Sequence, residues 1–316
     1  DEVQGLAREY IGIRILGAPA ALGNFALIGF AIGLHRTSVP LKMTVLMHSS
    51  NVLLDVLLVQ VWHFDVRGVA VASAVSEYLG LAGGLFWLRR EIFGAAWRAL
   101  PVGALKQVAP MLQLLAVNRD IFIRSLALLT VFFFFTAQGA RLGDTVLAAN
   151  AVLITFLLLL SNTLDGFANA AEALVGDATG RRDRRALDAA VAGTGKWTLI
   201  IAAAALLAFV AGGGPLIRLL TDLPGVRDTA TTYLPWMLLL PLTASAGFWL
   251  DGVFVAATLA RQMRNTMMVA TALFFPVWWL TSGWGNHGLW LAMNLFMASR
   301  GVLMGVGWYR ISAWAE

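Results

Sequence analysis

The chain has 316 residues, of which 59% are hydrophobic and 13% are charged, and its mean hydropathy is +0.75. Soluble domains are roughly 45–50% apolar, so this composition excludes an ordinary soluble fold and indicates an integral membrane protein. The sequence holds no cysteine, which excludes disulfides, a thiolate nucleophile and a cysteine-ligated metal site. Its net charge of +5 comes from short basic clusters between apolar stretches, a pattern typical of membrane orientation rather than nucleic-acid binding.

Apolar stretches long enough to cross a bilayer recur along the whole chain. The predicted spans are 11–34, 41–62, 66–88, 119–139, 145–176, 187–212, 230–258, 266–282 and 287–309. The more mixed stretch after the third span predicts a cytoplasmic amphipathic connector at 91–118. This connector separates residues 1–90, the remainder of an amino-terminal lobe, from a carboxy-terminal lobe of six helices at 119–316. The predicted fold is therefore an all-α membrane bundle.

Lysine and arginine alternate between the predicted loops, with most of them on one side of the membrane. The richer side holds Arg36, Lys42, Arg89, Arg90, Arg98, Lys106, Arg119, Arg181, Arg182, Arg184, Arg185, Arg261, Arg264 and Arg310, and the other side holds Arg67, Arg141, Arg218 and Arg227. By the positive-inside rule the richer side faces the cytoplasm, which places residue 1 outside the cytoplasmic membrane and residue 316 inside. Because residue 1 is placed outside and the opening DEVQGLAREY has neither an initiator Met nor a signal peptide, we expect that an odd number of spans precedes it.

Two parts of the chain are similar to each other. Residues 10–29 align with 233–252, and residues 65–90 align with 285–310, which pairs Tyr10 with Tyr233, Gly29 with Gly252, Gly68 with Gly288 and Arg90 with Arg310. The first three spans therefore repeat as the last three, in the same direction. The simplest account is that three matching helices precede residue 1 and that the intact molecule has two six-helix halves, a parallel-repeat transporter plan.

The run SNVLLDVLLV places Asn51 and Asp55 within a span that is otherwise apolar. Their spacing of four residues stacks them on one helical face, and His48 and Thr44 continue this polar stripe toward the cytoplasm. The matching segment of the repeat, residues 270–282, carries no carboxylate. Folding alone therefore does not require an acid at this point of the bundle.

An ionised carboxylate inside a span costs several kcal/mol unless a partner or a cation compensates its charge. We therefore expect Asp55 to bind a coupling ion, either a proton or a sodium ion that Asn51 also contacts. Asn24 and Ser73, on the two neighbouring spans, are expected to point into the same interior. For Asn51 and Ser73, interhelical hydrogen bonding explains a polar side chain as well as function does.

The second lobe carries intramembrane charges of its own. The acidic candidates are Asp165, Glu172 and Asp251, and the ion-pair candidates near the cytoplasmic end of the fourth span are Arg119, Asp120 and Arg124. Two of the acids lie two helical turns apart on one face of a long helix. An ion-pair network that holds the helices in register and a direct role in transport explain this group equally well.

No catalytic motif is recognisable in the sequence. The four histidines, at 35, 48, 63 and 287, lie on scattered spans and loops, and no HExxH, GxSxG or Walker sequence is present. We therefore expect a protein that is not an enzyme and that uses no cofactor other than its coupling ion.

Five segments together resemble one transporter family. They are YIGIRILGAP (10–19), NVLLD (51–55), VRGVAVAS (66–73), LAANAVL (147–153) and LDGFANAAEALVGDATG (164–180). In order and spacing they resemble the MATE (multidrug and toxic compound extrusion) transporters of the DinF-type branch, from the family's fourth helix to its twelfth. The resemblance implies a two-lobed exporter of twelve helices that exchanges protons or sodium ions for organic cations and other xenobiotics.

The resemblance also assigns roles to residues by position. Asn51 and Asp55 match the asparagine and aspartate of the family's amino-terminal cation site, and Ser73 stands where a threonine is usual. Asn24 and His48 fall at or near positions that line the drug cavity of the same lobe. The aspartate of the family's first helix has no place in this chain, so the resemblance implies that these residues form only part of the ion site.

The leading hypothesis is ion-coupled efflux of small organic cations by a monomer that contacts membrane lipids and no nucleic acid. The alternative is a flippase of the wider superfamily that moves lipid-linked saccharides or other lipids. Flippases of anionic head groups are expected to carry Arg or Lys within cavity-facing spans, whereas the acidic residues of this sequence favour cationic cargo. A non-transporting membrane fragment or scaffold is the third hypothesis.

Overall fold

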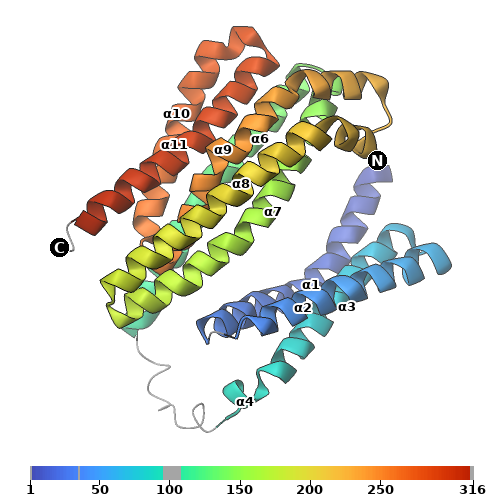
Figure 1. Ribbon diagram of the computed structural model, residues 1–316. Helices are drawn as coiled ribbons and strands as arrows, with labels where there is room; N and C mark the ends of the chain where they lie inside the picture. Colours follow the sequence, from blue (N-terminus) through green and yellow to red (C-terminus); the bar gives the residue numbers. More distant parts are fainter. Residues whose placement is uncertain (1, 35, 95–107, 314–316) are drawn as a thin grey trace. The chain divides into compact units, whose positions relative to one another are not determined.

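The computed structural model describes residues 2–34, 36–94 and 108–313, and the regular structure in these ranges is entirely helical (Figure 1). Within those ranges, nine helices are long and apolar enough to cross a membrane. They cover Gly5–Gly33, Ser38–Val61, Asp65–Trp87, Leu114–Arg141, Asp144–Arg181, Arg184–Leu220, Pro224–Ala256, Ala260–Trp284 and Asn286–Tyr309. The predicted all-α membrane fold is confirmed, although several helices begin before the predicted spans.

The chain divides into two compact units, unit 1 (Asp1–Gln107) and unit 2 (Val108–Glu316). The predicted lobe boundaries, 1–90 and 119–316, remain predictions. Most of the predicted connector, residues 95–107, lies outside the described residues. Its last part, from Val108 onward, belongs to the first long helix of unit 2.

Unit 1 is a bundle of three spans. Its elements are α1 (Glu2–Gly33), α2 (Ser38–Asp55), the π-helical segment η1 (Val56–Val61), α3 (Asp65–Trp87) and the short α4 (Arg89–Ile92). Small residues on α3 let it approach both neighbours: a Cβ atom at Gly80 would lie 2.3 Å from Cγ of Met47 on α2, and one at Gly84 would lie 2.9 Å from Cδ1 of Leu27 on α1. Membrane helices associate through such close packing, because lipid tails are as apolar as their side chains.

Unit 2 contains six spans. They are α6 (Val108–Arg141), α7 (Asp144–Arg181), α8 (Arg184–Leu220), α9 (Pro224–Ala256), α10 (Ala260–Thr281) and α11 (Asn286–Ala313), with the short 3-10 helix η3 (Ser282–Trp284) before α11. Helix α9 packs against α7, α8 and α11, and α10 packs against α6 and α11. Phe135, Phe156 and Trp290 are fully buried in the core between these helices.

The two helix triples that repeat in the sequence pack in the same way. In unit 1, α3 packs against both α1 and α2, which touch each other little, and in unit 2, α11 packs likewise against α9 and α10. A Cβ atom at Gly68 would lie 3.3 Å from the carbonyl carbon of Leu58, and one at Gly288 would lie 2.0 Å from the carbonyl oxygen of Thr281. Each of these paired glycines lets the start of the third helix approach the end of the second, which agrees with the predicted repeat.

Helices α7 and α8 are longer than a bilayer requires. With 38 and 37 residues they extend about 55 Å at 1.5 Å per residue, against roughly 30 Å of hydrocarbon. They join at Arg182, whose φ of +54° reverses the chain, and the Asp183 carboxylate caps α8 by accepting from the Ala186 backbone nitrogen at 3.0 Å. The joined ends, with the basic run 181–185, therefore extend beyond the hydrocarbon.

Candidate functional site

Asp55 is the last residue of α2 and is half-buried in unit 1. Its carboxylate oxygen Oδ1 is buried, and no hydrogen-bond partner for this atom lies among the described residues. A buried acceptor without a partner costs about 1–3 kcal/mol, and more when it is charged. A proton or a cation at this oxygen removes that cost, so Asp55 has the chemistry expected of an ion-coupling carboxylate.

The backbone changes from α-helix to π-helix directly after Asp55. The π-helical segment runs from Val56 to Val61. π-Helical turns are rare and occur frequently at functional sites. Two residues with left-handed backbone angles, His63 with φ of +55° and Asp65 with φ of +44°, then lead the chain into α3. The carboxylate therefore lies at a junction where the helical register changes.

Asn51 lies one helical turn before Asp55, and its amide nitrogen donates to the hydroxyl oxygen of Ser73 on α3 at 3.4 Å. A hydrogen bond of this length is weak, so both groups keep capacity for a further ligand. Asp55, Asn51 and Ser73 supply carboxylate, amide and hydroxyl oxygens, which are the atoms that hard cations prefer. This set of donors fits a proton held by Asp55 as well as a sodium ion shared with Asn51.

The other predicted residues of the first lobe lie elsewhere in unit 1. His48 and Thr44 are exposed, so the polar stripe passes from half-buried at Asn51 to the surface of the unit. Asn24 is buried, and its amide donates to the backbone oxygen of Glu77 at 2.8 Å. Asn24 therefore belongs to the contact between α1 and α3.

Glu77 on α3 is an intramembrane acid that the sequence reasoning missed. Its Oε1 accepts from Nη2 of Arg14 on α1 at 2.9 Å, whereas its Oε2 is buried and has no partner among the described residues. Gly17 makes room for this carboxylate, because a Cβ atom there would lie 2.5 Å from Oε2. Both Arg14 and Glu77 lie within predicted spans, so a search for opposite charges on neighbouring spans would have found the pair.

In unit 2, Asp251 on α9 lies between two arginines. Arg300 on α11 donates to its Oδ2 at 2.5 Å, and Arg124 on α6 donates to the same oxygen. Arg300 is only 1% exposed, and its guanidinium lies 5.3 Å from the ring centre of Phe248. Two positive charges face one negative charge, so the Asp251 cluster is basic. Arg124 thus contacts an acidic candidate, and Arg300, which was not among the candidates, completes the cluster.

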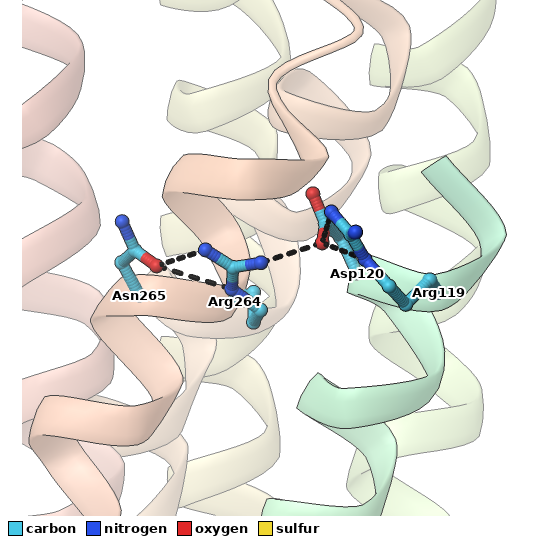
Figure 2. A network of polar contacts seen from close by, with 4 residues as sticks. All are labelled: Arg119, Asp120, Arg264 and Asn265. Carbon is cyan, nitrogen blue, oxygen red and sulfur yellow. Dashed lines mark hydrogen bonds and ion pairs between the residues drawn. The ribbon is translucent and has the colours of Figure 1, made fainter. Parts of the chain in front are cut away.

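A second ion-pair cluster joins α6 to α10 (Figure 2). Asp120 is 5% exposed, and its Oδ1 accepts from Arg264 at 2.6 Å and from Arg119 at 3.1 Å. Figure 2 shows that Arg264 also reaches the side chain of Asn265, at 2.8 Å from its Nη2. In the described part of the chain, Arg119 therefore pairs with Asp120, and Asp120 pairs with Arg264 of α10. Of the three ion-pair candidates, only Arg124 makes the expected contact with an acidic candidate.

Asp165 and Glu172 are the acidic candidates that remain available to a ligand. On α7, Asp165 is exposed and Glu172 is half-buried, and neither forms an ion pair within the described ranges. Asp165 lies close enough to Asp251 for the two like charges to repel each other. Asp165 is thus a carboxylate near the Asp251 cluster that forms no ion pair among the described residues.

A family model described as MatE matches residues 121–280, about half of the chain. The matched segment includes Arg124, Asp165, Glu172, Asp251 and Arg264, whereas Arg119, Asp120 and Arg300 lie outside it. The chain belongs to the MatE family. This membership agrees with the resemblance carried by the five sequence segments.

Curated MatE relatives are similar along nearly the whole chain. The DNA damage-inducible protein F of Escherichia coli is 38% identical over 314 residues, which cover 96% of this chain and 66% of that protein. Protein DETOXIFICATION 42 of Arabidopsis thaliana is 29% identical over 96% of this chain and 58% of that protein. The probable multidrug resistance protein NorM of Brucella suis is 26% identical over 76% of this chain and 52% of that protein. The chain spans between about half and two thirds of these relatives' lengths.

Solved structures share the fold. A crystal structure of MATE in the bent conformation has a TM-score of 0.86 and 19% identity, covering 99% of this chain and 70% of that chain. An outward-facing multidrug resistance MATE family transporter has a TM-score of 0.84 and 18% identity, and the match covers 96% of this chain and 69% of that chain. At these identities the likeness shows the fold alone. Together with the family match, it identifies this MatE chain as a multi-pass membrane protein of the multidrug and toxic-compound efflux family.

Proposed function

We propose that the protein is an ion-coupled antiporter, not an enzyme, that exports organic cations across the cytoplasmic membrane by alternating access. The observation that carries this proposal is the buried, unpartnered Oδ1 of Asp55 at the transition from α-helix to π-helix. The activity is assigned to the whole protein, because this chain covers 66% of its Escherichia coli relative. We expect a monomer with residue 1 outside and residue 316 in the cytoplasm, and no cofactor besides H⁺ or Na⁺.

Coupling requires a group whose affinity for the ion differs between two conformations. In the conformation described here, Asp55 has a buried oxygen that a proton or a sodium ion would satisfy. A change from π-helix to α-helix at Val56–Val61 would rotate the following residues relative to Asp55 and change which donors reach it. Ion binding and helix geometry would then favour each other reciprocally.

Organic cations are the proposed cargo because carboxylates remain free in unit 2 after its ion pairs are formed. Asp251 is neutralised by Arg124 and Arg300, so it is not available to a cation. Asp165 is exposed and Glu172 is half-buried on α7, and neither carboxylate forms an ion pair among the described residues. The negative charge of the cargo site is therefore assigned to these two residues.

A lipid flippase is the second candidate function, and the Asp251 cluster favours it. Flippases of anionic head groups were expected to carry basic residues within spans, and Arg124 and Arg300 both lie there. Two positive charges exceed one negative charge, so an anionic group would be attracted to the cluster. The antiporter stays the first proposal because Asp55 offers a buried oxygen to the coupling ion, and because Asp165 and Glu172 form no ion pair among the described residues.

Transport by everted membrane vesicles that contain the protein tests both functions. Uptake of a fluorescent organic cation is followed after a proton gradient or a sodium gradient is imposed, with an ionophore that collapses each gradient as control. The antiporter requires uptake that one gradient drives and its ionophore abolishes. Absence of uptake under both gradients contradicts the antiporter, and transfer of a fluorescent anionic lipid in the same vesicles would establish the second function.

A further inference from the structure

A cavity of about 500 Å³ lies between α8 and α9 in unit 2. Its lining is almost wholly apolar, and the residues that form most of it are Val191, Ala192, Leu199, Ile200, Ala246 and Trp249. Lys196 is the charged residue among those that line it. The cavity, called the α8–α9 groove below, thus combines an apolar wall with a single positive charge.

The wall of the α8–α9 groove is held in place by contacts across the two helices. The indole nitrogen of Trp249 donates to the hydroxyl oxygen of Thr194 at 3.0 Å. Trp249 also lies directly against Gly195, where a Cβ atom would approach its ring at 2.8 Å. The Trp249 side chain is therefore held against α8, and the groove beside it is part of the folded unit.

The position of Lys196 along α8 places it at the edge of the hydrocarbon. Between Lys196 and Arg218, residues 197–217 carry no charge and extend roughly 32 Å at 1.5 Å per residue. This matches the thickness of about 30 Å of a bilayer core. Trp197 beside it is 58% exposed, as expected for an aromatic residue in the interfacial belt. Lys196 therefore lies at the level of lipid phosphates.

The charge around Lys196 is not balanced by the protein. Lys196 is exposed, and no carboxylate of the described residues forms an ion pair with it. The basic run 181–185 lies at the same end of α8, and two of its arginines, Arg181 and Arg184, pair with Asp177 and Asp188. A ligand that complements this site has an anionic head and an apolar tail.

We propose that the α8–α9 groove binds an anionic phospholipid from the leaflet on the side of residues 181–185. Its phosphate pairs with the Lys196 ammonium group, and an acyl chain lies against Leu199, Ile200 and the Trp249 ring. This is a lateral lipid site, separate from Asp55 and from the carboxylates assigned to cargo, and it does not depend on the ion that drives transport.

Native mass spectrometry of the purified protein tests this site with phosphatidylglycerol and phosphatidylcholine of identical acyl chains. We expect tighter binding of phosphatidylglycerol, and a loss of about fivefold in Lys196→Gln, the effect expected of one basic residue at a lipid surface. Binding of phosphatidylcholine should not change in that variant. Ala192→Phe, which fills the groove from an exposed position, should weaken binding of both lipids.

Lys42→Gln is the matched control, because Lys42 is an exposed lysine on α2 of unit 1. Lys196→Arg keeps the charge and should retain binding. Melting temperatures establish that each variant is folded. Phosphatidylglycerol binding that is unchanged in Lys196→Gln, or that falls equally in Lys42→Gln, overturns the proposal. Equal loss of both lipids in Lys196→Gln would also overturn it, since charge would then not select the ligand.

Discussion

The guanidinium of Arg300 and the carboxylate of Asp251 lie 2.5 Å apart in the interior of unit 2 and join α11 to α9. Arg124 reaches the same oxygen atom from α6. One carboxylate therefore connects three helices at a place that solvent hardly reaches, since Arg300 is 1% exposed. This arrangement sets the order in which substitutions in the cluster should destabilise the protein.

We expect Asp251→Ala to destabilise unit 2 more than Arg300→Met does. The first change leaves two arginines without a counter-charge and should cost about 3–5 kcal/mol, whereas the second leaves Arg124 paired with Asp251 and should cost less. Unfolding by denaturant in detergent measures both. Asp222→Ala is the control, because the side chain of Asp222 is fully exposed. A larger effect for Arg300→Met than for Asp251→Ala would contradict this description of the cluster.

Gly288→Ala should destabilise the contact between α10 and α11. Its Cβ atom would lie 2.0 Å from the carbonyl oxygen of Thr281, so the helices must move apart at a cost of about 1–3 kcal/mol. Gly283→Ala is the matched control, since a Cβ atom there meets nothing within 4 Å. Thermal unfolding compares the two variants, and equal melting temperatures would show that the close approach is not required.

Double-mutant cycles should separate the two arginines that contact Asp120 (Figure 2). The Arg264 side chain is 20% exposed, and its pair with Asp120 should show a coupling energy of about 1 kcal/mol or more. The Arg119 side chain is 63% exposed, and its pair should contribute roughly 0–0.5 kcal/mol. The cycles use Gln for each arginine and Asn for Asp120. Equal coupling energies would mean that burial does not determine which pair stabilises the helices.

Asn150→Ala should destabilise the contact between α7 and α11. Asn150 and Asn286 exchange two hydrogen bonds at 2.8 and 2.9 Å, and the indole of Trp290 donates to Asn150 at 2.9 Å. The substitution leaves a buried amide and a buried indole unpaired, which costs about 1–3 kcal/mol. Unfolding by denaturant, followed by near-ultraviolet circular dichroism, measures the loss, and the exposed Thr155→Ala on the same helix serves as control. An unchanged stability would show that water replaces the lost bonds.

Hydropathy predicted the spans well because a run of about 20 apolar residues has few alternatives to crossing the membrane. Their ends were predicted less well. Helix α8 begins at Arg184 and α9 at Pro224, since hydrogen bonding continues a helix into water after the apolar run has ended. The repeat was informative because Gly68 and Gly288 both allow an approach that any larger residue would block.

The candidate site was only partly predictable. Asp55 and Asn51 stand out because they interrupt an apolar run at helical spacing. Arg300 and Glu77 emerge only when opposite charges on different spans are compared, because the partner of each lies on a distant part of the sequence. Spacing along the sequence does not show that Asp251 is paired whereas Asp165 is not. This difference depends on which side chains of other helices lie nearby.

The proposed coupling role of Asp55 is tested most directly by gradient-driven export of a fluorescent organic cation. Asp55→Asn and Asp165→Asn are compared in the same everted vesicles. Asparagine keeps the size of aspartate and one acceptor oxygen, but it holds neither a titratable proton nor a negative charge. We expect Asp55→Asn to abolish exchange under the driving gradient, and Asp165→Asn to remain coupled while its affinity for the cation falls. Normal export by Asp55→Asn would contradict the assignment of coupling to this residue.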